Sequence, residues 1–167
     1  MSDGKQPSST PRRWPILTLI IAGFVLVADQ VSKSFAEAHL GLAPEHVFGP
    51  FGLALTYNTG SSFSLLQGSS IPLMVLDVIL VIVLLVVARR TESMGIRVGL
   101  GLMMGGALGN LADRLARHHD RGVVDFITLP HWPTFNLADS AITLGTLVII
   151  ISVLVDMARH RQEQDVS

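Results

Sequence analysis

The chain has 167 residues, of which 49% are hydrophobic and only 15% are charged, with a mean hydropathy of +0.52 and a formal charge of −1. Soluble domains carry about 25% charged residues, so this composition indicates a protein that resides in a membrane. The near-zero charge gives no support for nucleic-acid binding, and the absence of cysteine excludes disulfides, thiolate catalysis and cysteine metal sites.

The first apolar segment follows a polar tail, residues 1–13, which we expect to be cytoplasmic. The uncharged stretch 16–28 rises only about 20 Å as a helix, short of the roughly 30 Å hydrocarbon core. We therefore expect a helix over 14–36 that carries Asp29 into a helix bundle. A secretory signal peptide with a cleavage site at 36–38 is the alternative, but two charged residues separate that site from the apolar stretch.

The loop expected over 40–70 contains the pattern of a strand. Phe51, Leu53, Leu55 and Tyr57 alternate with small or polar residues, and a period of two is typical of a strand or hairpin. We expect a small sheet at the membrane surface in this loop.

Three further apolar segments predict membrane helices over 71–88, 96–112 and 137–157. Most of the 12 Lys and Arg residues lie in the two tails and in the loop between the second and third helices, which predicts that both termini are cytoplasmic. We expect one domain of four transmembrane helices over 14–158, a membrane all-α fold, followed by a cytoplasmic tail, 159–167.

This topology collects polar residues from separate segments at one face of the membrane. Ionisable residues within a membrane are costly and usually functional, and scattered structural polar residues would not converge in this way. The group comprises Asp29, Lys33, Asn58, Asn110, Asp113, Arg114, Asp125, Asn136 and Asp139.

Asp125 and Asp139 have the simplest catalytic interpretation. Two neighbouring carboxyls in a poorly solvated site cannot both ionise cheaply, so one keeps its proton and the other acts as general base toward water. This pattern predicts aspartic-type hydrolysis. The alternative for Asp139 alone is a cap that interacts with the dipole at the start of the last helix.

The remaining polar residues have two interpretations each. Asn58, Asn110, Asn136 and Arg114 are suited to hold a peptide backbone or a developing oxyanion, which are functions of amide and guanidinium donors. Arg114 has the alternative of pairing with Asp113 or Asp29. Asp29 and Lys33 are spaced i, i+4, so they form either a structural ion pair or part of a substrate site.

Small and acidic residues elsewhere have mainly structural interpretations. Gly101, Gly105 and Gly109 share one face of the third helix, where they favour packing within the bundle over a dimer interface. Asp77 is interpreted as a buried polar residue of the second helix, and Asp156 as a marker of the cytoplasmic end of the fourth.

Histidines raise a metal alternative. His118, His119, Asp120 and His131 lie close in sequence, and imidazole and carboxylate groups bind zinc. Adjacent histidines usually point in different directions, and no histidine pair has helical spacing. We therefore expect no metal and no other cofactor.

Five motifs together resemble the bacterial lipoprotein signal peptidases, or type II signal peptidases. They occur in the same order across almost the whole chain after the tail, so the resemblance is specific. The motifs are DQVSK (29–33), NTG with Phe63 (58–63), GGALGNLADR (105–114), VVDF (123–126) and FNLAD (135–139).

The resemblance implies an integral membrane aspartic peptidase with four helices and a small extracytoplasmic β-cradle. Such enzymes act in the bacterial cytoplasmic membrane, where they cleave prolipoproteins before a diacylglyceryl-modified cysteine and are blocked by globomycin. We expect a monomer surrounded by membrane lipids. Asp125 and Asp139 would be the catalytic dyad, and the supporting or substrate-binding residues would be Asn58, Asn110, Arg114, Asn136, Asp29, Asp113, Lys33 and Gly106.

The chain departs from the family pattern at two places. Ser61 and Ser62 stand where the family often has alanine, and the stretch 116–121 is longer than the usual link to the first catalytic aspartate. Two other classes of function remain as alternatives: a small proton-coupled transporter or channel, and a non-catalytic lipoprotein-binding membrane protein. A transporter site usually lies near the midplane between internal repeats, whereas these acids collect near one face and no repeat is visible.

Overall fold

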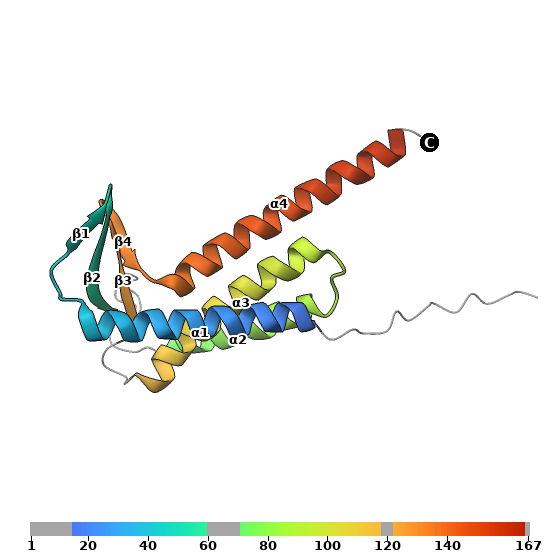
Figure 1. Ribbon diagram of the computed structural model, residues 1–167. Helices are drawn as coiled ribbons and strands as arrows, with labels where there is room; N and C mark the ends of the chain where they lie inside the picture. Colours follow the sequence, from blue (N-terminus) through green and yellow to red (C-terminus); the bar gives the residue numbers. More distant parts are fainter. Residues whose placement is uncertain (1–14, 60–70, 118–121, 166–167) are drawn as a thin grey trace, which may run out of the picture.

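This computed structural model describes residues 15–59, 71–117 and 122–165. These residues contain four helices and four strands (Figure 1). The order along the chain is α1, β1, β2, α2, α3, β3, β4 and α4. The N-terminal tail, Ser61, Ser62, Phe63 and the two adjacent histidines lie outside the described residues. The helices are α1 (Ile16–His39), α2 (Ile71–Ala88), α3 (Met94–Ala116) and α4 (Leu137–Asp165), and the strands are β1 (Glu45–Phe48), β2 (Phe51–Asn58), β3 (Val123–Leu129) and β4 (Trp132–Phe135).

Helix α1 has a buried face and an apolar exposed face. Its buried residues recur every three or four positions, the spacing of one helical stripe. The stripe carries uncharged residues at both ends and two charged residues between them; it consists of Thr18, Ala22, Val25, Asp29, Lys33 and Ala36. The opposite face exposes large apolar side chains such as Phe24 and Val31, as expected for contact with lipid.

Glycines of α3 allow two helices to approach it closely. A Cβ at Gly101 or Gly105 would lie within 3 Å of backbone or side-chain atoms of α1, and a Cβ at Gly99 would lie within 3 Å of Gly145 in α4. Gly109 faces Asp29 of α1. The glycine face that we expected to pack within the bundle therefore does so, against α1.

Helix α2 packs on α3 through an apolar cluster. Leu84 and Ala88 of α2 are buried with Leu100 and Met104 of α3, together with Ala22 of α1. In Figure 1 the C-terminal part of α4 extends beyond the other helices.

Three of the described helices are long and apolar enough to cross a membrane: α1, α2 and residues Leu137–Arg159 of α4. The sequence predicted four such helices. Helix α3 is not among the three, because its many glycines and its polar residues, including Arg97, Asn110 and Asp113, lower its hydropathy.

The strands form one antiparallel sheet in the order β1-β2-β3-β4. The predicted small sheet is thus confirmed, and the alternating segment forms β2. The expectation placed the sheet in the loop 40–70 alone, whereas two of its strands come from the chain after α3. In the register of β2 with β3, Thr56 lies opposite Asp125 and Asn58 lies opposite Val123. The sheet therefore brings the end of β2 next to Asp125, at one end of the helices (Figure 1).

Candidate functional site

Asp125 and Asp139 both contact Asn136, which lies between β4 and α4. Asn136 Nδ2 donates to Asp125 Oδ1 at 2.7 Å, and the Asn136 backbone N–H donates to Asp139 Oδ2 at 3.3 Å. Asp125, in β3, is only 2% exposed, whereas Asp139, in the first turn of α4, is half-buried. The structure therefore brings the two predicted catalytic carboxyls into one hydrogen-bond network with unequal access to solvent.

Two further amides hold the remaining oxygens of these carboxyls. Asn58 Nδ2 donates to Asp125 Oδ2 at 3.0 Å, and Asn110 Nδ2 donates to Asp139 Oδ1 at 2.9 Å. These donors come from β2 and α3, far from the carboxyls in sequence. Every oxygen of the two carboxyls thus accepts a hydrogen bond, which fixes the orientation of both groups.

Asn136 and Asp139 also cap the start of α4. Asn136 Oδ1 accepts the backbone N–H of Asp139 at 2.9 Å, while Asp139 Oδ2 accepts the backbone N–H of Asn136. This reciprocal arrangement is a capping box. The capping interpretation of Asp139 is therefore realised, but it occupies only one carboxylate oxygen and is compatible with a second role for the other.

A buried ion cluster supports the site from α1 and α3. Lys33 Nζ lies 2.8 Å from Asp29 Oδ2, 3.0 Å from Asp113 Oδ2 and 3.0 Å from Asn110 Oδ1. The side chains of Lys33, Asp29 and Asp113 are fully buried. An ammonium has three N–H donors, so the cluster gives each one an acceptor, as a buried charge requires.

The two aspartates of the cluster each bind the backbone beside one candidate catalytic residue. Asp29 Oδ1 accepts the N–H of Ala138 at 2.9 Å, and Asp113 Oδ2 accepts the N–H of Val124 at 3.1 Å. These contacts show that Asp29 and Lys33 form a structural ion pair that also belongs to the site.

Gly106 lies in the contact between α3 and α4. A Cβ at Gly106 would be 2.8 Å from Ile142 Cγ1 and 3.2 Å from the carbonyl carbon of Ala138. The absence of a side chain therefore lets the first turn of α4, which carries Asp139, approach α3.

Arg114 pairs with Asp77 and with neither of the partners considered from sequence. Its Nη1 lies 2.6 Å from Asp77 Oδ2, between α3 and α2, whereas Asp29 and Asp113 are engaged by Lys33. Sequence reasoning gave Asp77 no partner, because the only signal was a single charge in an otherwise apolar helix.

Gln30 and Arg117 belong to the network and were not predicted as site residues. Gln30 Nε2 donates to Asp113 Oδ1 at 2.8 Å, and Arg117 forms an ion pair with Glu37 and donates to Ser34 Oγ at 2.9 Å. The position of Gln30 inside the motif at 29–33 was the available signal for it.

Burial is the main perturbation of Asp125. Together with the charge of Asp139, it raises the pKa of Asp125 to about 7, although the amides of Asn58 and Asn136 and the charge of Lys33 oppose the change. Asp125 is therefore suited to hold a proton near neutral pH.

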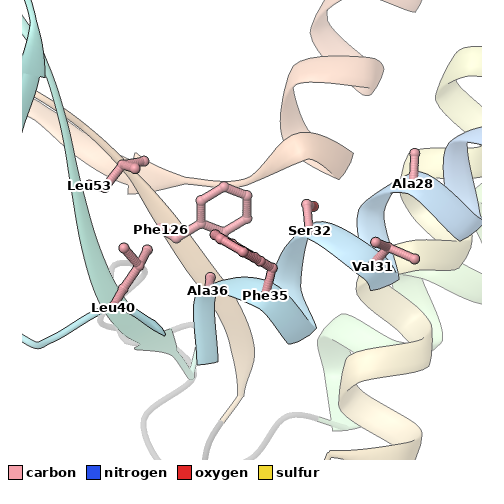
Figure 2. A pocket seen from close by; sticks show the side chains of 8 residues that line it. All are labelled: Ala28, Val31, Ser32, Phe35, Ala36, Leu40, Leu53 and Phe126. Carbon is pink, nitrogen blue, oxygen red and sulfur yellow. The ribbon is translucent and has the colours of Figure 1, made fainter. Parts of the chain in front are cut away.

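An apolar cavity of 560 Å³ lies between α1 and the sheet (Figure 2). Phe35 of α1 and Phe126 of β3 contribute its aromatic side chains, and it contains no charged residue. Phe126 follows Asp125 directly, and successive strand residues point to opposite faces, so this cavity lies on the other side of β3 from the Asp125 carboxyl. Its lining is Ala28, Val31, Ser32, Phe35, Ala36, Leu40, Leu53 and Phe126.

No group of three or more His, Asp and Glu side chains with metal-binding geometry occurs within residues 15–59, 71–117 and 122–165. His131 lies in the turn between β3 and β4. His118, His119 and Asp120 lie outside these ranges, so the structure does not bear on them.

The sequence matches the family model of signal peptidase (SPase) II over residues 21–155. A lipoprotein signal peptidase of Pseudomonas paraeruginosa is 43% identical over 164 residues, covering 90% of this chain and 91% of that protein. A lipoprotein signal peptidase of Rhodococcus jostii is 36% identical, covering 91% of this chain and 78% of that protein. Two solved structures, each described as a bacterial membrane enzyme, superpose on this chain with a TM-score of 0.73. The first is 29% identical, and the match covers 85% of this chain and 90% of that structure. The second is 30% identical, and the match covers 82% of this chain and 92% of that structure. The chain therefore belongs to the signal peptidase II family of membrane peptidases.

Proposed function

We propose that this peptidase removes signal peptides from prolipoproteins by cleaving before a diacylglyceryl-modified cysteine, with Asp125 and Asp139 as its catalytic dyad. Membership of the family supports the substrate class. The observation that carries the dyad is the shared network in which Asn136 contacts both carboxyls and each carboxylate oxygen accepts a hydrogen bond.

The unequal surroundings of the two carboxyls support a division of roles. Asp125 is buried and has a pKa near 7, so it holds the proton at rest. Asp139 is half-buried and is the charged general base that takes a proton from water. The water oxygen bonds to the scissile carbonyl carbon while the Asp125 proton stabilises the developing oxyanion. When the carbon–nitrogen bond breaks, the departing amine takes a proton from the dyad, and no cofactor is required.

The supporting residues divide into positioning groups and a substrate-binding group. Asn58, Asn110 and Asn136 orient the dyad, since their amide nitrogens donate to its carboxylates. Asp29, Lys33 and Asp113 fix the backbone next to each dyad member, and Gly106 allows α4 to approach. Arg114 retains donors that suit a substrate carbonyl, because its one hydrogen bond to the described residues uses Nη1 alone.

The proposed setting is the bacterial cytoplasmic membrane, with four spans, both termini in the cytoplasm and the site near the extracytoplasmic face. Helix α3 serves as the fourth span, because its 23 residues reach about 34 Å and its contacts with α1, α2 and α4 shield its polar groups from lipid. In this setting the acyl chains of the substrate remain in the bilayer while its peptide reaches the site. We expect a monomer that globomycin-type inhibitors block.

The test is cleavage of a lipid-modified prolipoprotein by wild type, Asp125→Asn and Asp139→Asn in a reconstituted membrane. Each variant should lose at least about 10³-fold in turnover while inserting normally, since a dyad member acts on the reacting atoms. Asp156→Asn is the matched control, because Asp156 is a half-buried α4 carboxylate on the C-terminal half of the helix, away from Asp139, and should cleave at the wild-type rate. Wild-type cleavage by either dyad variant would contradict the assignment.

A further inference from the structure

Asp77 is the single charged residue of α2, an 18-residue helix that is otherwise apolar. A carboxylate in a membrane helix is costly unless it is paired, and such residues usually serve a function. Its partner is Arg114 of α3, and the side chains of Asp77 and Arg114 are only 16% and 12% exposed. The pair is therefore a mostly buried link between two helices.

The ion pair with Asp77 uses a single nitrogen of the Arg114 guanidinium. Only Nη1 of Arg114 donates to Asp77, at 2.6 Å, and the other donors of Arg114 have no hydrogen-bond acceptor within the described part of the chain. A guanidinium carries five N–H donors in a rigid plane. Fixing one nitrogen of that plane limits the directions in which the remaining donors point.

The pair lies at the edge of the candidate site. Arg114 follows Asp113, which belongs to the buried ion cluster, and the charges of Asp139 and Lys33 both act on Asp77. Arg114 is thus one residue from Asp113, whose Oδ2 accepts the N–H of Val124 beside Asp125.

We propose that Asp77 is a positioning residue that holds Arg114 so that its free N–H donors bind a main-chain carbonyl oxygen of the substrate. The proposal rests on the proposed function, since it names a binding interaction of that same site. Without Asp77, Arg114 would be a largely buried cation that turns toward another carboxylate, and its donors would no longer point at the substrate.

The experiment measures KM and kcat for a lipidated peptide substrate with wild type, Asp77→Asn, Arg114→Gln and the double variant. Asp77→Asn should raise KM about tenfold, as expected for the loss of one oriented charge-assisted hydrogen bond. The double variant should match Arg114→Gln alone, and Asp77→Glu should recover most of the affinity. An unchanged KM for Asp77→Asn, or an effect that multiplies with that of Arg114→Gln, would overturn the proposal.

An exchanged pair, Asp77→Arg with Arg114→Asp, separates positioning from simple helix linkage. It keeps the ion pair, so the melting temperature should stay near that of wild type, but it moves the donors to α2, so KM should remain raised. A wild-type KM in the exchanged variant would show that the pair only joins the helices, and would refute the proposal. Failure of the proposed function is distinguishable, because it would appear as retained cleavage by Asp125→Asn whatever the behaviour of Asp77.

Discussion

Lys33 donates a hydrogen bond from Nζ to Oδ1 of Asn110 at 3.0 Å, and this contact determines which way the Asn110 amide faces. An ammonium can only donate, so it requires the amide oxygen on its own side. The amide nitrogen of Asn110 must then face Asp139, to which it donates at 2.9 Å. A buried charge on α1 thereby orients a hydrogen bond made to the proposed dyad.

Lys33→Met should be strongly destabilising. It leaves Asp29 as a buried carboxylate without a cation and Asp113 with Arg117 as its one remaining cation, and removing one partner of a buried pair costs about 3–5 kcal/mol. The measurement is the melting temperature of the purified protein in detergent. Phe24→Leu, on the exposed face of α1, is the control and should melt near wild type.

A compensating change sharpens the Lys33 prediction. Adding Asp29→Asn to Lys33→Met removes the carboxylate charge that lost its only cation and should recover part of the lost stability. If the double variant melts lower than Lys33→Met alone, the charge imbalance is not the cause.

Asn136→Asp and Asn136→Ala should separate helix capping from catalysis. Aspartate is a good N-cap, so Asn136→Asp should keep the cap of α4, yet it replaces the buried donor to Asp125 with a negative charge and should lose almost all cleavage activity. Asn136→Ala should lose activity and more stability than the about 1 kcal/mol of a missing cap, because the Asn136 amide also donates to buried acceptors on Asn110, Val124 and Asp125. Thermal melts and cleavage rates of both variants would check this, and an active Asn136→Asp protein would contradict the role of its amide.

Gly106→Ala should reduce activity by moving the first turn of α4. The added Cβ would lie 2.8 Å from Ile142 Cγ1 and also too close to the backbone of Ala138, so the turn that carries Asp139 must shift. Gly23→Ala is the matched control, because a Cβ at Gly23 of α1 meets no atom within 4 Å. Alanine is favoured over glycine in a helix by about 0.5–1 kcal/mol, so the control should be neutral or slightly stabilised.

The pH dependence of the protein's stability should report the protonation of Asp125. Its folded-state pKa of about 7 exceeds the ordinary value of 3.8, so between these values the folded protein keeps a proton that the unfolded chain has released. Its contribution to stability is full below about pH 4 and is lost as the pH rises to about 7. Asp125→Asn should therefore gain stability relative to wild type over this interval, as measured by paired melting curves.

The same proton should control turnover. Because the proposed mechanism needs Asp125 protonated at rest, kcat/KM of the wild type should fall as the pH rises above about 7. A kcat/KM that stays constant to about pH 9 would contradict the assignment of the resting proton to Asp125.

Local patterns predicted the helices from the length of their apolar segments and strand β2 from its period of two. Strands β3 and β4 were missed as sheet elements: Val123 and Val124 are both buried, so β3 begins without alternation, and β4 has only four residues. Helix α3 was predicted from its apolar segment, although its glycines and polar residues keep it out of the three helices that are long and apolar enough to cross a membrane.

The contacts within the site depend on tertiary structure and could be predicted only in part. The predicted membrane topology indicated that the polar residues collect at one face of the membrane. The i, i+4 spacing indicated the pairing of Lys33 with Asp29. Arg114 and Asp77 are 37 positions apart in the sequence and lie on two different helices, so no helical period predicts that they pair. Which of several nearby carboxylates a cation selects is decided by helix rotation and packing.

The network around Asn136 draws on α1, β2, α3, β3 and the start of α4, so no segment of the chain contains a working set of groups. While the chain is entering the membrane, each carboxyl lacks the amides that orient it, and Asp125 lacks the burial that lets it keep a proton. Under the proposed mechanism, peptide hydrolysis therefore begins only when the last helix has docked. The proposed dyad would then be unable to cleave neighbouring membrane proteins until the protease itself has folded.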